Sequence, residues 1–184
     1  MAMDRRTFTK SIASFLTSAA GLSLFHTQLY ARQYLTVEQA KTILWGNEKL
    51  EPQVVKLTLA QRKAIREGSK IRVRRSNLQA WKSQSGGWFI LDYVIGKHEY
   101  IDYAIALEKN GAVRGLEILH YRESYGGDVR HKRWRNQFSG HSHTTNLRLN
   151  KEVMSITGAT MSCRHLVEGV NRINHTWKVA LSML

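Results

Sequence analysis

The sequence predicts an α+β fold in which an antiparallel sheet carries a long C-terminal helix and is preceded by short helices. Apolar residues recur every three or four positions in two short segments near the start and in one long segment at the end, which indicates amphipathic helices. In the middle of the chain, two runs with alternating apolar residues flank an Asn-Gly pair, a strong hairpin signal. Strands and helices do not alternate regularly and Gly-x-Gly-x-x-Gly is absent, which argues against a doubly wound nucleotide-binding fold.

Two short helices are expected first. The segment from Thr36 to Trp45 has apolar residues at helical spacing behind a threonine suited to capping, and the segment from Thr58 to Glu67 repeats this arrangement. Basic and apolar residues mix from Lys70 to Gln84, and the chain then breaks at Gly86-Gly87. We expect the strands to begin after that break.

The strands are expected at the aromatic run Trp88–Leu91, at Tyr100–Leu107 and at Val113–Tyr121. Residues 130–138 are compatible with a short helix, and the polar residues 139–146 are typical of a loop. The clearest element is a helix from about Ser162 to the end of the chain. We expect it to pack on the sheet through one apolar stripe, made of Cys163, Leu166, Val167, Val170, Ile173, Trp177, Ala180 and Leu181.

A segment of small and hydroxyl-bearing residues, SITGATMS at 155–162, precedes this helix. The unpaired amides and the positive dipole end at a helix start favour an anion. Gly158 allows a close backbone approach, while Thr157, Thr160 and Ser162 offer hydroxyl groups. Because Ser and Thr are also ordinary helix caps, the pattern alone leaves both a phosphate site and a structural helix start open.

The TGAT segment resembles the flavin-attachment motif of the FMN-binding domain family. That family includes the flavin subunits of the sodium-pumping NADH:quinone oxidoreductase and of the Rnf complex, together with small exported relatives. The stretches VIGKHE at 94–99, YRESYGG at 121–127 and WRNQFSG at 134–140 also resemble the exported members, so the resemblance covers about residues 86–172. Four separate stretches in the right order are far more specific than TGAT alone.

The resemblance implies an FMN joined through its phosphate to Thr160 by an FAD-dependent FMN transferase, in a loop shaped by Thr157, Gly158 and Ala159. One position departs from the motif, because Met154 stands where the family has its leading Asp. An exported protein that binds FMN non-covalently, or that has kept the fold without the cofactor, is therefore the alternative. Ser162 is also expected at the phosphate, and the expected contacts to the flavin ring are Tyr121, Glu123, Tyr125 and Gly126.

These ring contacts have a competing interpretation, because a strand end with a core-covering Tyr and glycines in a turn fits the same residues. The implied function is electron transfer, with no catalytic residue assigned, since a flavin accepts two electrons and releases them singly. The expected partner is a membrane or periplasmic redox protein. Whether a reaction is completed on this chain stays open.

The first residues are predicted to form a twin-arginine export signal, so we divide the chain into a signal at 1–31 and an FMN-binding domain at 32–184. DRRTFTK at 4–10 precedes an uncharged, moderately apolar run from Ser11 to Phe25, shorter than a membrane span. A surface helix and an uncleaved anchor are the alternatives. The expected location is periplasmic or extracytoplasmic, with or without association with the membrane.

The remaining composition bears on partners. The formal charge is +14, which attracts polyanions, anionic membranes or acidic proteins. The basic segment 70–75, followed by Trp81 and Trp88, suits nucleic acid in principle, but an exported protein is expected to use it on an acidic redox partner or the membrane exterior. His141 and His143 are interpreted as solvated loop residues, so no metal site is assigned. The single cysteine, Cys163, excludes an intrachain disulfide and is expected to pack in the core.

Overall fold

The computed structural model describes residues 32–184, so the predicted export signal at 1–31 lies outside the described residues. One antiparallel sheet of six strands forms the centre, in the order β1-β6-β5-β4-β3-β2. Its strands are β1 (Arg32–Gln33), β2 (Leu50–Lys56), β3 (Asn77–Ser83), β4 (Trp88–Ile95), β5 (Tyr100–Leu107) and β6 (Val113–Tyr121).

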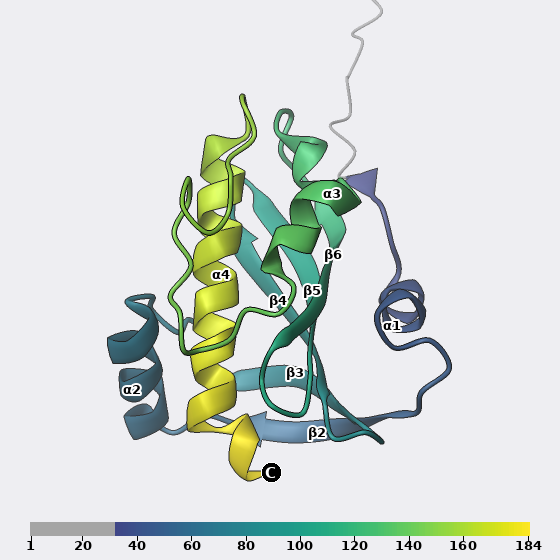
Figure 1. The fold of residues 1–184 in the computed structure, drawn as a ribbon, viewed down its shortest axis with the longest axis vertical. Helices are drawn as coiled ribbons and strands as arrows, with labels where there is room; N and C mark the ends of the chain where they lie inside the picture. Colours follow the sequence, from purple (N-terminus) through teal and green to yellow (C-terminus); the bar gives the residue numbers. More distant parts are fainter. Residues whose placement is uncertain (1–31) are drawn as a thin grey trace, which may run out of the picture.

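Helices cover both faces of this sheet (Figure 1). The long helix α4 (Thr160–Val179) and α2 (Leu59–Ser69) lie on one side, and α1 (Val37–Trp45) lies on the other. The short α3 (Lys132–Arg135) stands between two 3-10 turns, Gly127–Arg130 and Asn136–Phe138, and a last 3-10 turn covers Leu181–Met183. This arrangement confirms the α+β prediction. Within residues 32–184, no helix combines the length and the apolar character needed to cross a membrane.

The two short helices begin where the sequence predicts. Thr36 and Thr58 are the N-caps of α1 and α2, and each forms a reciprocal capping box with the glutamine three residues later. These caps satisfy backbone amides that have no partner within the helix.

The sheet extends further than the sequence predicts. Strands β5 and β6 have the predicted bounds, and β4 continues past Leu91 to Ile95. Strands β1, β2 and β3 were not predicted, although β2 and β3 pair along seven positions from Leu50↔Ser83 to Lys56↔Asn77. Only Val55 is buried in β2, and Pro52 is tolerated there because β2 is an edge strand. Partial burial hides the period-2 pattern on which the prediction depends.

The core has two parts, one on each face of the sheet. The larger lies under α4 and includes the predicted apolar stripe, with Trp177 only partly buried. The smaller lies under α1 around Trp45 and Phe89. On α4, Arg172 forms a largely buried ion pair with Asp92, whose carboxylate also accepts a hydrogen bond from the Tyr103 hydroxyl at 2.9 Å. This polar link ties α4 to β4 and β5.

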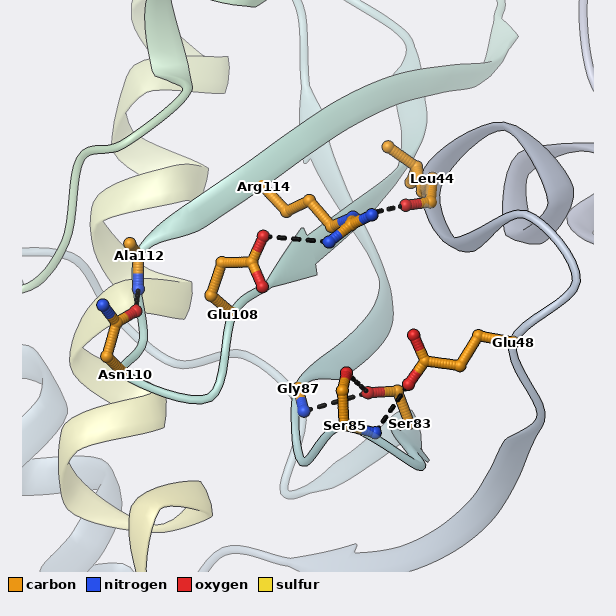
Figure 2. Close-up of polar contacts among 9 residues, drawn as sticks. All are labelled: Leu44, Glu48, Ser83, Ser85, Gly87, Glu108, Asn110, Ala112 and Arg114. Carbon is orange, nitrogen blue, oxygen red and sulfur yellow. Dashed lines mark hydrogen bonds and ion pairs between the residues drawn. The ribbon is translucent and has the colours of Figure 1, made fainter.

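Hydrogen bonds between side chains and the backbone stabilise the end of the sheet that carries the β3–β4 and β5–β6 turns (Figure 2). The Ser85 amide donates to Glu48 at 2.6 Å, and the Gly87 amide donates to the Ser83 hydroxyl at 2.9 Å. On β6, Arg114 donates to the Leu44 carbonyl at 2.8 Å and thereby holds the end of α1 against the sheet. We call this region the turn end.

Candidate functional site

A cleft of about 460 Å³ lies at the opposite end of the sheet. It opens between the start of α4, the segment that follows β6 and the β4–β5 turn. Its size falls within the range of ordinary ligand pockets. We call this region the cleft end; the cleft is lined by Lys97, His98, Glu123, Ser124, Tyr125, Gly158, Ala159, Thr160, Met161 and Ser162.

The start of α4 supplies one wall and has the features of an anion site. The Ala159 amide donates to the Ile156 carbonyl at 3.0 Å, closing a turn in which Gly158 adopts φ 82°, a value that favours glycine. Ala159 is the N-cap, and no side chain caps the helix. The first-turn amides therefore keep free donors, and Thr160 is exposed beside them.

Tyr121 fixes the start of α4 to the end of β6. Its hydroxyl donates to the Tyr125 carbonyl at 2.5 Å, so the Ser162 hydroxyl, 2.9 Å away, must donate to the tyrosine oxygen. Burial raises the pKa of Tyr121 above its ordinary value, which keeps this hydroxyl protonated at neutral pH. Gly126 permits the arrangement, since a Cβ there would lie 2.7 Å from the Tyr121 hydroxyl.

Glu123 shapes the opposite wall. Its carboxylate accepts hydrogen bonds from the amides of His98 at 2.5 Å and Glu99 at 3.0 Å, which fixes the β4–β5 turn. Burial alone would raise its pKa, but the amides of Glu99, His98 and Lys97 hold the pKa below the ordinary value. Glu123 thus orients a turn that places Lys97 and His98 on the cleft wall.

The structure brings most of the predicted site residues to this cleft. The predicted residues that line it are Glu123, Tyr125, Gly158, Ala159, Thr160 and Ser162. Tyr121, Gly126 and Thr157 lie next to lining residues but do not line it themselves. Tyr121 is only 3% exposed and belongs to the core, whereas Tyr125 is 85% exposed. Of the two predicted tyrosines, Tyr125 is therefore the one available for stacking on a ring.

Sequence reasoning assigned no role to four lining residues, Lys97, His98, Ser124 and Met161. Their positions depend on the meeting of the β4–β5 turn with α4, a long-range contact. The one available signal was the stretch VIGKHE, which contributes to the family resemblance without assigning a role to Lys97 or His98.

Met154, at the departing motif position, is 58% exposed, and its backbone is firmly held. Its amide donates to the Gln137 side chain at 2.8 Å, and its carbonyl accepts from the Trp134 indole at 2.7 Å. The nearest acid in sequence, Glu152, is paired with Arg148 at 3.0 Å; its hydrogen bonds from Arg148 lower its pKa to about 2. Glu152 is thus engaged elsewhere and does not replace the motif carboxylate.

The other candidate groups are not arranged as sites. Among the described residues, no three His, Cys, Asp or Glu side chains gather as a metal-binding group would. His143 stacks on Trp177 at 5.6 Å between ring centroids, while Cys163 is buried, which raises the pKa of its thiol. A buried neutral thiol is consistent with packing.

Comparisons with known proteins agree with this cleft. Residues 96–174 match the sequence profile of the FMN-binding domain, a segment that contains every lining residue. The chain contains an FMN-binding domain. FMN is therefore its cofactor, and the cleft fits it, because it joins ligand-sized space to open helix amides that suit a phosphate.

One solved structure shows the fold. The crystal structure of Shewanella oneidensis NqrC is 16% identical, with a TM-score of 0.54, over 79% of this chain and 87% of that one. A subunit of the Na(+)-translocating NADH-quinone reductase from Parabacteroides distasonis is 11% identical, with a TM-score of 0.42, over 79% and 89%. Curated protein sequences give no significant match.

Proposed function

We propose that this FMN-binding domain is an exported electron carrier whose FMN phosphate is esterified to Thr160 and which exchanges electrons with a membrane redox partner. The observation that carries the proposal is the exposed Thr160 at an uncapped helix start within the cleft. When bound, FMN supplies two-electron uptake and one-electron release.

In this proposal, different residues of the chain bind different parts of the cofactor. The open amides at the start of α4 bind the phosphate, and the turn at Gly158 leaves room for it. Lys97 would bring a positive charge to the opposite wall, and the exposed Tyr125 ring would stack on the flavin. Tyr121 and Glu123 position these groups through hydrogen bonds.

The attachment of FMN to Thr160 is a balanced reaction when FAD is the FMN donor. The Thr160 Oγ forms a bond to the FMN phosphorus, the bond to the AMP moiety of FAD breaks, and AMP leaves with the hydroxyl proton transferred to solvent or a base. An FMN transferase is the proposed catalyst. The Thr160→Ala variant from the native host should contain no denaturation-resistant flavin, while Thr157→Ala, which removes the exposed hydroxyl before Gly158, should retain it.

Peptide mass spectrometry of yellow protein that survives denaturation should place the FMN mass on Thr160. Unmodified Thr160 in such protein would exclude the proposed bond. Colourless native protein that also fails to bind added FMN would exclude the carrier itself and favour a cofactor-free exported protein.

Met154 favours non-covalent FMN as the second candidate, because the position lacks the carboxylate that the family motif carries. The Met154→Asp variant tests this directly. If recognition by the transferase limits attachment, this variant should carry more covalent flavin than the wild type when both are produced with that enzyme. Equal, high loading of both proteins would show that the carboxylate is dispensable here.

Export is proposed from the twin arginines and the apolar run in the first 31 residues. Replacing Arg5 and Arg6 by lysine should leave the protein in the cytoplasmic fraction of the native host. Unchanged secretion of the double variant would exclude the twin-arginine route.

A further inference from the structure

A second groove, of about 260 Å³, runs beside α4 and differs in character from the FMN cleft. Its rim carries three exposed basic side chains, Lys70, Arg72 and Arg74, from the segment between α2 and β3. Arg172 also contacts the groove, but its guanidinium is paired with Asp92. Glu168 is the acidic residue among those that line it.

This groove and the FMN cleft share no lining residue, but they follow each other along two chain segments. On the sheet side, Ile95 lines the groove and Lys97 lines the cleft, while the Gly96 carbonyl between them lies 3.0 Å from the His165 Nδ1. On the helix side, Met161 lines the cleft and Glu168 lines the groove.

Arg164 belongs to the same side of α4. It is three residues after Met161 and four before Glu168, so the three side chains share one face of the helix. Arg164 is exposed. We define Lys70, Arg72, Arg74 and Arg164 as the basic strip.

The basic strip keeps its charge unneutralised. Within residues 32–184, ion pairs form at other basic residues, such as Arg148 with Glu152 and Arg122 with Asp102, and no ion pair involves a member of the strip. The left-handed backbone of Lys70, φ 65°, ends α2 and turns the chain into the basic segment. Exposed like charges on adjoining elements create a positive field along the groove.

We propose that the basic strip docks a carboxylate-rich face of a protein redox partner, which places the partner's redox centre beside the FMN cleft. Only the redox role of that partner rests on the proposed function. Complementary charge steers association and fixes orientation, which suits a transient electron-transfer contact.

A protein partner fits the strip better than a lipid surface does. Proteins that lie in a membrane interface add buried apolar area to the attraction of basic charge. None of the exposed large apolar side chains of the described part of the chain lines the groove. The exposed Met161 beside Arg164 lines the cleft that FMN is proposed to fill. The groove is also concave, which suits protruding acidic side chains.

The test compares two charge-reversal variants of equal net charge. Arg72→Glu with Arg74→Glu alters the strip, whereas Lys49→Glu with Lys109→Glu alters the turn end, where Leu50 pairs with Ser83 and Leu107 pairs with Val113. The probes are poly-L-glutamate and vesicles of phosphatidylcholine with phosphatidylglycerol. Binding is measured at low and high salt, and the retained flavin of each variant is recorded separately.

The strip variant should bind poly-L-glutamate about tenfold more weakly than the control variant at low salt, with the difference lost at high salt. In the wild type, poly-L-glutamate should protect Lys70 from acetylation more than Lys49 and Lys109. Equal weakening in both variants, or a strip effect confined to vesicles, overturns the proposal. Because binding is read without the flavin signal, colourless protein would count against the proposed function and leave this result intact.

Discussion

The two ends of the sheet differ in whether side chains accept hydrogen bonds from their backbone amides. At the turn end, side chains accept the hydrogen bonds of the turn amides: Glu48 binds Ser85, Ser83 binds Gly87, and Asn110 binds Ala112 at 3.0 Å (Figure 2). At the cleft end, Glu123 accepts amides of the β4–β5 turn, but α4 begins without a side-chain cap.

This difference separates stability from binding. A turn whose amides are hydrogen-bonded to protein side chains adds to the stability of the fold, and those amides are not available to a ligand. A helix start that lacks a cap forgoes about 1 kcal/mol of that stability and keeps its amides for an anion. Substitutions at the turn end should therefore lower the free energy of unfolding without affecting FMN, whereas those at the cleft end should affect both.

The largest contrast is expected between two glycines with positive φ. Gly126→Ala places a Cβ against the Tyr121 hydroxyl at 2.7 Å and the Ala159 Cβ at 3.2 Å, so we expect a loss of about 2 kcal/mol and less retained FMN. Gly86→Ala meets only the flexible Lys109 side chain at 3.3 Å, so we expect about 1 kcal/mol and normal FMN. Urea unfolding and flavin absorbance measure both; equal FMN loss in the two variants would contradict the comparison.

Tyr121→Phe should have the next largest effect. It removes the hydroxyl that links Ser162 to the Tyr125 carbonyl and leaves the buried serine without this partner, which costs about 1.5 kcal/mol. The loosened start of α4 should also bind FMN more weakly. Tyr100→Phe, at a side chain 47% exposed, is the control, and we expect it to change neither quantity.

Arg114→Met tests the turn end. The variant loses the bond to the Leu44 carbonyl and the pair with Glu108 at 3.1 Å, and its partial exposure limits the expected loss to about 1 kcal/mol. FMN content should equal that of the wild type. A clear loss of flavin without unfolding would show that the two ends are coupled.

Glu123→Gln should give the smallest effect at neutral pH, below about 1 kcal/mol, because the amide oxygen can still accept from the turn. The folded pKa of Glu123 lies below 4.5, so its charge contributes stability above pH 4.5 that is lost as pH falls through the lowered folded pKa. The wild type should therefore lose more stability than the variant in that acidic window. Parallel stability curves, from urea unfolding at each pH, would rule out this role.

The sequence predicted those elements whose apolar pattern matches their burial. The predicted bounds of strands β5 and β6 agree with the structure at both ends. Helix α4 begins at Thr160, two residues before the predicted start at Ser162. Strand β2 was missed because Val54 is fully exposed and Val55 stands alone in the core, so no alternation is visible.

The candidate site was predictable as far as it follows local motifs. TGAT at a helix start is a contiguous signal that predicts Thr160 and its neighbours as one site, and Gly158, Ala159 and Thr160 line the cleft. The roles of Tyr121 and Glu123 depend on partners 41 and 24 or 25 residues away in the chain, and no local pattern gives the direction in which such side chains point. Ser162 was expected to meet the phosphate, and the structure shows that its hydroxyl is already engaged with Tyr121.

The two residues of β1 have a consequence for how the domain is presented. Arg32 pairs with Tyr121, so the described chain begins beside the FMN cleft and far from the turn end. A tether of any kind attached at this point would hold the cleft toward its anchor and turn the opposite end outward.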